Sequence, residues 1–450
     1  MLRTVGPPGS LFELLLPAGL RVLSGELLQV DAVLDDPVFL VPFKAFFDPS
    51  EGRPSIPMET YVRFMFLKFR YSLGYEQLCV AVSDSLSWRR FCRIGLEAQV
   101  THESTFRKIT RRCGPVLIEA LNDALLAKAH GAGLVDLGMV RVDTTVVEAD
   151  IKYPTESGLL TKAVSRIAVL LRRLDRAGVA AGFVDRTSEA RAHAHSIGVW
   201  LRRRSDEAKA EVLAITGLLA DLAELSCSEL EVVLAATTRR RRRSVRHQLD
   251  KLTVLAERTR KLIGQARCRV AGTQPDGATR LVSLHEPDAR PISKGRLGRP
   301  VEFGYKAQVA DNADGLIVDY SVMIGNPHDA ELLAPAIEAV GRRLGSVPTL
   351  VTADRGYWTP TAEADLQGLG VTDVAIPRTG KPSAARRAIE QDATFVTAVK
   401  WPTGCEGRTS HLKRDRGWRR TRLDGHAGAR IWCGHGVFAH NITKLVRLQE

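Results

Sequence analysis

The sequence has little cysteine and lacks any long apolar run. Its 7 cysteines are scattered through 450 residues, and no two of them form a CxxC pair. This pattern indicates reduced thiols rather than a disulfide framework or a zinc ribbon. No apolar segment is long enough to cross a bilayer. We therefore expect a cytoplasmic protein without a membrane-spanning part.

Acidic residues are also fewer than basic ones. The chain has 51 Asp and Glu against 64 Lys and Arg, which gives a net charge of +13. The excess is concentrated in two regions. From Arg378 to the C-terminus there are 15 Lys and Arg against 6 Asp and Glu, and from Arg53 to Arg112 there are 11 against 5. A clustered basic excess predicts nucleic acid as a partner. With 44% hydrophobic residues the chain can bury a sizeable core, and its length suggests two or three domains.

Residues 1 to about 130 are predicted to be largely helical. After Pro57, apolar residues recur at helical spacing from Tyr61 to Tyr71, with basic residues between them. Further helices are expected to begin at Tyr75, Ser87 and about Ser104. The result is a compact helical module with arginines on its outside. A helix-turn-helix is one arrangement of it, although the spacing does not require one.

A different pattern begins at Gly138, where a β-branched apolar run to about Glu148 predicts a buried strand. Two later runs suit a β-hairpin, and helices then alternate with strands. The hairpin strands are Glu302 to Ala310 and Leu316 to Met323; the helices are Asp329 to Leu344, Thr359 to Leu369 and Glu406 to Arg416; the strands between them are Thr349 to Ala353 and Thr372 to Ile376. This order predicts a mixed sheet covered by helices, and it is the order of the ribonuclease-H-like fold.

The segment from about Leu159 to Ala271 interrupts that order. Its periodic runs, rich in Leu, Ala and Arg, predict the helices of a separate insertion. We therefore expect an α/β protein with a ribonuclease-H-like catalytic domain at 131–450, a helical insertion at about 159–271, and an all-α DNA-binding domain at 1–130.

Three acidic residues stand on elements that suit a phosphodiester-cutting site. Asp143 lies within an apolar strand, Asp354 closes another, and Glu406 begins a helix that carries Lys413 on the same face. Cutting DNA needs an activated water and a neutralised leaving oxygen, which two divalent ions held by carboxylates supply. Each acid also has an ordinary structural explanation. Asp143 can bond a neighbouring loop, Asp354 can cap a helix or turn, and Glu406 can belong to a surface salt-bridge face.

The ordered set resembles the DDE transposases of bacterial insertion sequences, specifically the ISNCY-like branch. Asp143-Thr-Thr-Val-Val-Glu resembles the first-acid motif, Asp354-Arg-Gly-Tyr the second, and Glu406 with Arg408 and Lys413 the third. The stretch from Arg53-Pro-Ser-Ile-Pro onward resembles the helical domain that precedes the catalytic core. The resemblance implies that the three acids hold two Mg²⁺ or Mn²⁺ ions per active site.

The resemblance also implies partners and a reaction. Arg408 and Lys413 would contact phosphates beside the scissile bond, and Arg355 and Arg414 are further candidates for DNA contact. The partner would be double-stranded DNA, both the transposon ends and the target, bound by a homodimer or larger synaptic complex on the bacterial nucleoid. The enzyme would bind terminal inverted repeats, cleave the strands and join the freed 3′-OH ends to target DNA. Many relatives carry a tyrosine and an arginine shortly before the glutamate, where this chain has Val399 and Pro402.

Two alternatives stay open. One is a catalytically inactive DNA-binding protein on the same scaffold, against which the intact acids at 143, 354 and 406 argue. The other is an endonuclease that cuts without joining. The acids that compete with the assigned triad are Glu148, Asp150, Glu390 and Asp415.

Three weaker features have an ordinary interpretation beside a functional one. Lys306 can reach a phosphate, but an exposed strand lysine is the more ordinary interpretation. Tyr357 can stack on an unpaired base, although a core aromatic is more ordinary. Cys433, His435 and His440 suggest a zinc cluster, yet their spacing fits no usual site, and buried or hydrogen-bonded histidines are simpler.

Overall fold

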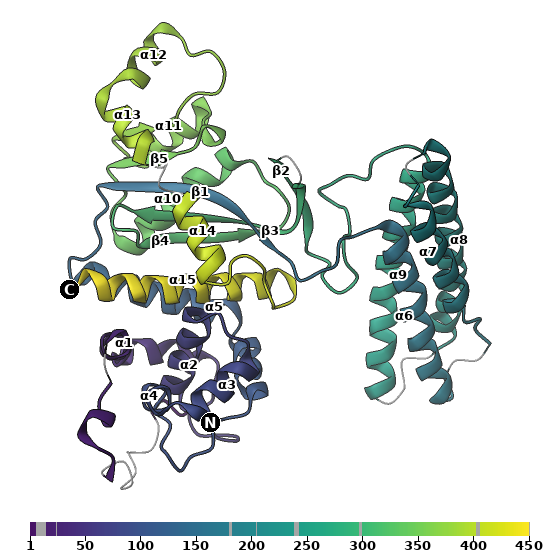
Figure 1. Cartoon of the computed structure of the whole chain (residues 1–450), viewed down its shortest axis with the longest axis horizontal. Helices are drawn as coiled ribbons and strands as arrows, with labels where there is room; N and C mark the ends of the chain where they lie inside the picture. The colour runs from purple at the N-terminus through teal and green to yellow at the C-terminus, as the bar shows by residue number, and fades with distance from the viewer. Residues whose placement is uncertain are drawn as a thin grey trace. The chain divides into compact units, whose positions relative to one another are not determined.

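The computed structural model describes residues 1–5, 15–23, 25–179, 182–203, 205–237, 243–296, 299–401 and 406–449 (Figure 1). It divides into two compact units. Unit 1 consists of Met1–Asp150 and Tyr305–Glu450, and unit 2 of Ile151–Gly304. Within the described ranges, none of the helices combines the length and the apolar character needed to cross a membrane.

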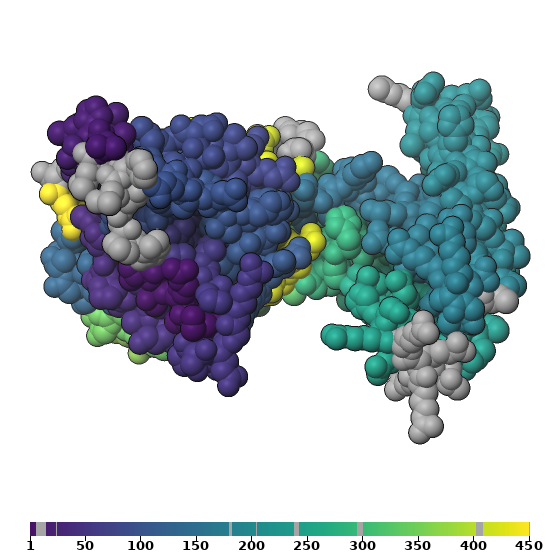
Figure 2. Space-filling model, turned by 90° about the horizontal axis from the view of Figure 1, so that it is seen from below, coloured from purple at the N-terminus to yellow at the C-terminus, as the bar shows by residue number. Residues whose placement is uncertain are grey.

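The first part of unit 1 is helical, as predicted. Its elements are η2 (Ala18–Leu20), α1 (Glu26–Leu34), η3 (Pro37–Ala45), α2 (Met58–Arg70), α3 (Tyr75–Asp84), α4 (Leu86–Phe91) and α5 (Glu103–Gly131). The helices predicted near Tyr61, Tyr75, Ser87 and Ser104 are therefore confirmed as α2 to α5. The long helix α5 bends at Gly114, whose φ of +63° only glycine adopts readily, directly before Pro115. In Figure 2 these N-terminal helices form the near face of unit 1.

A mixed sheet follows, built from β1 (Met139–Glu148), β3 (Arg299–Asn312), β4 (Ile317–Met323), β5 (Leu350–Ala353) and β6 (Asp373–Ala375). Its strand order within unit 1 is β4-β3-β1-β5-β6. The β3–β4 pair is antiparallel, whereas β1 pairs with β5, and β5 with β6, in parallel. All five predicted strands are confirmed, and so is the mixed character of the sheet.

Helices cover the sheet: α10 (Asp329–Leu344), α11 (Pro360–Gly368), α12 (Ala384–Gln391), α13 (Ala393–Lys400), α14 (Glu406–Asp415) and α15 (Gly425–Leu448). Helix α10 contacts β4, α13 contacts β5 and β6, and α14 contacts β1. The predicted helices α10, α11 and α14 are confirmed. The helices α12, α13 and α15 were not predicted.

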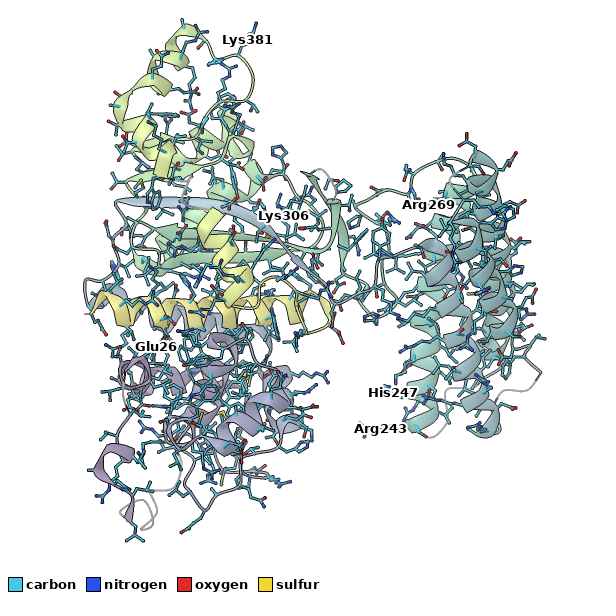
Figure 3. All side chains as sticks on the ribbon, in the orientation of Figure 1. Glu26, Arg243, His247, Arg269, Lys306 and Lys381 are labelled. Carbon is cyan, nitrogen blue, oxygen red and sulfur yellow. The ribbon has the colours of Figure 1, made fainter. Side chains whose placement is uncertain are left out.

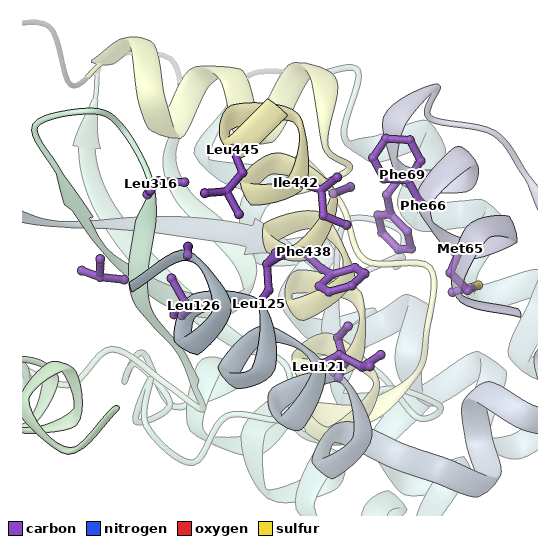
Figure 4. Packing of buried hydrophobic residues seen from close by; sticks show 14 of the residues in the cluster. Met65, Phe66, Phe69, Leu121, Leu125, Leu126, Leu316, Phe438, Ile442 and Leu445 are labelled. Carbon is purple, nitrogen blue, oxygen red and sulfur yellow. The ribbon is translucent and has the colours of Figure 1, made fainter. Parts of the chain in front are cut away.

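Helix α15 is the centre of unit 1, where it contacts α1, α2, α5 and β4. Figure 4 shows Phe438 and Ile442 of α15 packed among leucines of α5 and phenylalanines of α2. Gly434 permits this close approach, because a Cβ there would lie 2.5 Å from Tyr320 Oη and 2.9 Å from Ile118 Cγ1. The helix α15 is buried on nearly all sides, and it contains Gly428, Gly434 and Gly436, which are poor helix formers, so local propensity gave little sign of it.

The described part of unit 2 is a helical bundle followed by a β-hairpin. Its helices are α6 (Glu156–Arg176), α7 (Thr187–Trp200), α8 (Asp206–Ala236) and α9 (Arg243–Val270), and β2 (Arg290–Arg296) pairs antiparallel with the first part of β3. The core is aliphatic, with Leu160, Leu219 and Leu252 fully buried. The insertion helices expected within about 159–271 are confirmed in the described helices α6 to α9.

Candidate active site and nucleic-acid interface

Strand register brings two of the predicted acids together. Val142 of β1 lies opposite Ala353 of β5 in parallel register, and Asp143 and Asp354 are the next residues along the two strands. Neighbouring strands lie about 4.8 Å apart and paired residues face the same side of the sheet. Asp143 is half-buried and Asp354 is exposed. The two carboxylates therefore share one face of the sheet where β5 ends.

Backbone amides orient both carboxylates. The Oδ1 of Asp143 accepts a hydrogen bond from the Thr144 N–H at 2.7 Å, and the Oδ1 of Asp354 accepts one from the Gly356 N–H at 2.9 Å. Asp354 thereby caps η4 (Arg355–Tyr357), so its interpretation as a turn-capping residue is confirmed. Because the Gly356 N–H bonds to Oδ1, Asp354 can cap η4 and still offer its other carboxylate oxygen, Oδ2, to the site.

Glu406 is the first residue of α14, and its side chain lies outside the described residues. The helix itself is well anchored. It contacts β1 and α15, and Arg408 Nε donates to Asp311 Oδ2 of β3 at 2.9 Å. The guanidinium of Arg408 lies against Gly315 in the β3–β4 turn, where a side chain would collide with it. Arg408 therefore has a protein partner that the sequence did not indicate.

Asp311 binds a second arginine that the sequence analysis missed. It accepts hydrogen bonds from Arg141 Nε at 3.0 Å and Arg141 Nη2 at 2.5 Å, and both side chains are at most 4% exposed. The Arg141 guanidinium also lies 4.6 Å from the centre of the Trp401 ring. A signal existed, since a charged residue within an apolar strand needs a buried partner. This network ties β1, β3 and α14 together beside Asp143.

Lys306 of β3 is buried, so its interpretation as an exposed strand lysine is wrong (Figure 3). The reason is that the chain leading into α10, at Pro327 and Asp329, contacts the end of its side chain. Lys306 Nζ lies 2.7 Å from Asp329 Oδ1 and donates to the Pro327 carbonyl at 2.6 Å. The same Asp329 oxygen accepts a hydrogen bond from Thr144 Oγ1 at 3.0 Å. Asp329 was missed because an acid in the first turn of a helix is ordinary.

Tyr357 lies beneath these acids. Burial raises the pKa of its phenol well above the usual value, and the charges of Asp329 and Asp143 act in the same direction. It is therefore a protonated core residue, as the more ordinary interpretation predicted, and not a stacking platform. A Cβ on the neighbouring Gly356 would lie 3.1 Å from Asp354 Oδ1 and 3.8 Å from Asp329 Oδ2, so Asp329 is also close to Asp354.

The donor chemistry of the site suits a hard divalent cation, since carboxylate oxygens are the ligands that Mg²⁺ and Mn²⁺ prefer. Among the side chains that the structure describes, no group of three or more His, Cys, Asp or Glu is arranged to hold a metal ion. Asp143 and Asp354 supply a pair of oxygen donors, and the third predicted donor, on Glu406, is not among those side chains.

The simpler interpretation of the C-terminal histidines is confirmed. His435 and His440 are buried, and His440 Nε2 makes a hydrogen bond with the Gly315 carbonyl at 2.9 Å. Burial lowers the pKa of His435 to about 3, and Lys68 adds to the shift, so its ring stays neutral. These residues pack the centre of α15.

Lys413 and Arg414, both predicted DNA contacts, line a basic cavity of about 200 Å³ in unit 1. Its other cationic side chains are Lys68, Arg419, Arg420 and Arg422. Residues from the two basic regions of the sequence meet here. Burial, with Arg422 and Arg107 nearby, lowers the pKa of Lys68 to about 7. We refer to this site as the basic cavity.

The competing acids each have a basic partner. Arg420 Nη2 lies 2.9 Å from Glu148, and Arg420 Nη1 lies 3.5 Å from Asp150. Asp415 pairs with His411 and Arg414, and Glu390 pairs with Arg386. Arg355, the remaining predicted DNA contact, is exposed directly after Asp354.

A second basic hollow, of about 510 Å³, lies among the N-terminal helices of unit 1. Arg53, Lys108 and Arg112 line it, and the Arg112 guanidinium lies 4.4 Å from the centre of the Phe47 ring. Cations beside an aromatic ring are a common feature of surfaces that bind nucleic acid.

Comparison with known families supplies the decisive observation. Residues 22–112 match the family described as "Transposase domain (DUF772)", and residues 279–442 match "Transposase DDE domain". The chain belongs to the DDE transposases of insertion sequences. The transposase is also 31% identical, over 145 residues, to a protein of Rhizobium meliloti described as "Uncharacterized protein ORF8 in nfe locus". That alignment covers 30% of this chain and 67% of the relative. No solved structure matches significantly.

The family matches include only some of the predicted catalytic acids of the transposase. Asp354 and Glu406 lie within the DDE match, whereas Asp143 and the helices α6 to α9 lie outside both matches. DDE transposases process nucleic acid and generally use divalent metal ions. The assignment of Asp143 therefore depends on its strand register with Asp354.

Proposed function

We propose that this transposase cleaves DNA at the terminal inverted repeats of its element and joins the freed 3′-OH ends to target DNA. Asp143, Asp354 and Glu406 would be its catalytic acids. The observation that carries the proposal is the register of β1 with β5, whose last printed pair, Val142 with Ala353, directly precedes Asp143 and Asp354. The strand order β4-β3-β1-β5-β6 supports a ribonuclease-H-like fold for the catalytic domain.

The three acids would hold two Mg²⁺ or Mn²⁺ ions, which when bound supply an activated nucleophile and charge for the leaving oxygen. The chain's own residues prepare the site. The Thr144 and Gly356 amides orient the carboxylates of Asp143 and Asp354. Lys306 neutralises Asp329, which keeps uncompensated negative charge away from an incoming phosphate.

The Arg141–Asp311–Arg408 network would position α14 and therefore Glu406. Arg408 lies two residues after Glu406 and is held on β3 by Asp311. Because Asp311 is itself held by Arg141, two residues before Asp143, the network couples the helix of the third acid to the strand of the first. Catalytic groups must be held within about 0.5 Å of the productive geometry. Arg408 would thus act mainly by positioning.

The cations of unit 1 suit the DNA backbone. Lys413 and Arg414 in the basic cavity, and Arg355 beside Asp354, would contact phosphates. The hollow lined by Arg53, Lys108 and Arg112 suits an N-terminal domain, at residues 1–130, that recognises the ends of the element. Two ends must be processed together, so we expect a homodimer or larger synaptic complex, acting on the bacterial nucleoid.

The test is cleavage of supercoiled DNA that carries the element's ends, with Mg²⁺ and with EDTA. We expect Asp143→Asn, Asp354→Asn and Glu406→Gln each to reduce cleavage by more than about 1,000-fold, while DNA binding persists. Asp365→Asn, an exposed acid on α11, is the matched control and should cleave like the wild type.

The outcomes separate the alternatives. Cleavage that survives one substitution would mean that the wrong acid has been assigned. Wild-type binding without cleavage would indicate an inactive scaffold, and cleavage without strand-transfer products would indicate an endonuclease.

A further inference from the structure

A basic groove runs along the helical bundle of unit 2, between α6 and α9. Its volume is about 720 Å³. Basic residues on its walls are Lys162, Arg166, Arg173, His247, Lys251 and Arg258, and Asp250 is the one acid among the described residues that line it. None of the proposed catalytic acids belongs to unit 2, so the proposed reaction leaves this groove unexplained.

The two helices present the same pattern to the groove. On α6 the residues at 162, 166, 169 and 173 are Lys, Arg, Val and Arg, and on α9 those at 247, 251, 254 and 258 are His, Lys, Val and Arg. The spacing of four, three and four residues places each set on one helix face. At 1.5 Å per residue, each row is about 16 Å long. Figure 3 shows His247 near one end of α9.

The groove cations are not neutralised by the bundle. Lys162, Arg166, Arg173 and Lys251 are exposed, and none of them forms an ion pair with a carboxylate in the described part of the chain. Two other arginines of these helices are paired: Arg172 binds Asp185 at 3.1 Å, and Arg260 binds Glu231. Like charges gathered along one face repel one another, so an anionic ligand would relieve this repulsion.

We propose that this groove binds the sugar-phosphate backbone of duplex DNA, independently of its sequence. The proposal rests on the proposed function, because it assumes that the transposase handles DNA. Each strand of a duplex carries a phosphate about every 3.4 Å along the axis, so a row of about 16 Å faces roughly five phosphates of one strand. Lysine and arginine supply the charge, and the aliphatic floor formed by Val169 and Val254 offers no hydrogen bonds for reading bases.

Charge reversal in the full-length protein tests the groove. The variant Arg166→Glu with Lys251→Glu changes one exposed cation on each wall. The control, Arg176→Glu with Lys261→Glu, makes the same change on the same two helices outside the groove. Binding of a duplex of unrelated sequence would be measured by fluorescence anisotropy at salt concentrations from about 50 to about 200 mM NaCl. Equal melting temperatures of the variants would show that the bundle is intact.

We expect the groove variant to bind on the order of tenfold more weakly. The slope of log Kobs against log salt concentration should be smaller in magnitude by about 1.8, because two phosphate contacts are lost. The control should stay within about twofold of the wild type, which separates phosphate contact from net charge. Equal effects of the two variants, or no effect of either, would overturn the proposal.

The catalytic assay separates this proposal from the proposed function. If the wild type cleaves DNA while the groove variant binds normally, only the groove proposal fails. If the wild type binds DNA without cleaving it and the groove variant loses binding, the groove proposal stands and the catalytic one fails. Absence of any DNA binding by the wild type would overturn both.

Discussion

Unit 1 and unit 2 treat charged side chains differently. Unit 1 buries Arg63, Lys68, Arg141, Lys306 and Asp311. Among the described charged residues of unit 2, only Glu156 and Glu286 are buried, beside a largely aliphatic core. A buried charge is tolerated only with a well-aligned partner, so each one constrains the geometry around it. Unit 1 is therefore organised by specific polar contacts close to its candidate site, and unit 2 by amphipathic helices whose surface is free to carry charge.

The largest expected effect compares two carboxylates that each bind two arginines. Asp311→Ala in unit 1 would leave Arg141 buried without a partner, and should lower the free energy of unfolding by about 3–5 kcal/mol. In unit 2, Glu156 binds Arg280 at 2.6 Å and Arg269 at 3.0 Å, but the side chain of Arg269 is 34% exposed. Glu156→Ala should cost less, about 1–2 kcal/mol, because water reaches both released arginines, which are 34% and 14% exposed, more readily than it reaches Arg141 at 4%. Urea unfolding measures both, and equal costs would contradict the contrast between the units.

A smaller effect compares two helical glycines. Gly434→Ala in α15 would bring a methyl group against Tyr320 and Ile118, and overpacking of this kind costs about 1–3 kcal/mol. A Cβ added at Gly264 in α9 would meet no described atom within 4 Å, so Gly264→Ala should raise helix stability by up to about 1 kcal/mol. Thermal unfolding of the two variants should therefore shift in opposite directions; a stabilised Gly434→Ala would show that α15 is less tightly enclosed.

A pH-dependent effect is expected from Lys68. Its pKa is about 7 in the folded protein, and about 10.4 in an unfolded chain. Between these values the unfolded state binds more protons, so Lys68 makes wild-type stability rise with pH by up to about 1.4 kcal/mol per unit. The cost of the buried charge is complete below about pH 7 and is relieved as the pH approaches about 10.

Lys68→Met removes that charge, so its advantage over the wild type should be largest near about pH 6 and shrink towards about pH 10. Lys261→Met, at an exposed position of unit 2, should leave the slope unchanged. Urea unfolding at several pH values gives the comparison, and parallel curves for the wild type and Lys68→Met would contradict the lowered pKa.

The local sequence pattern was enough to predict elements that have one polar and one apolar face, and strands formed by a run of β-branched residues. The strands β1 and β5 and the helix α10 are confirmed close to their predicted ends. The pairing of Asp143 with Asp354 was also within reach of the sequence, since both acids stand on predicted strands of one sheet. The helix α15 was not predicted, because its interior glycines at 428, 434 and 436 lower its helix propensity.

Partners distant in the chain could not be predicted. Arg141 and Asp311 are 170 residues apart, and Lys306 and Asp329 are joined only because β3 and α10 meet beside β1. A single sequence shows that a charge lies in an apolar strand, but not which opposite charge reaches it.

The sequence by itself determined the alternation of helices and strands and the basic excess, and it supplied the acids proposed for the site, since these depend on residue type and local spacing. Tertiary structure alone decided that Lys306 is buried, that Arg408 is held by Asp311, and that the rows on α6 and α9 face one groove. The physical reason is that burial and ion pairing depend on which surfaces meet, and that is set by packing of the whole core rather than by any short stretch of chain.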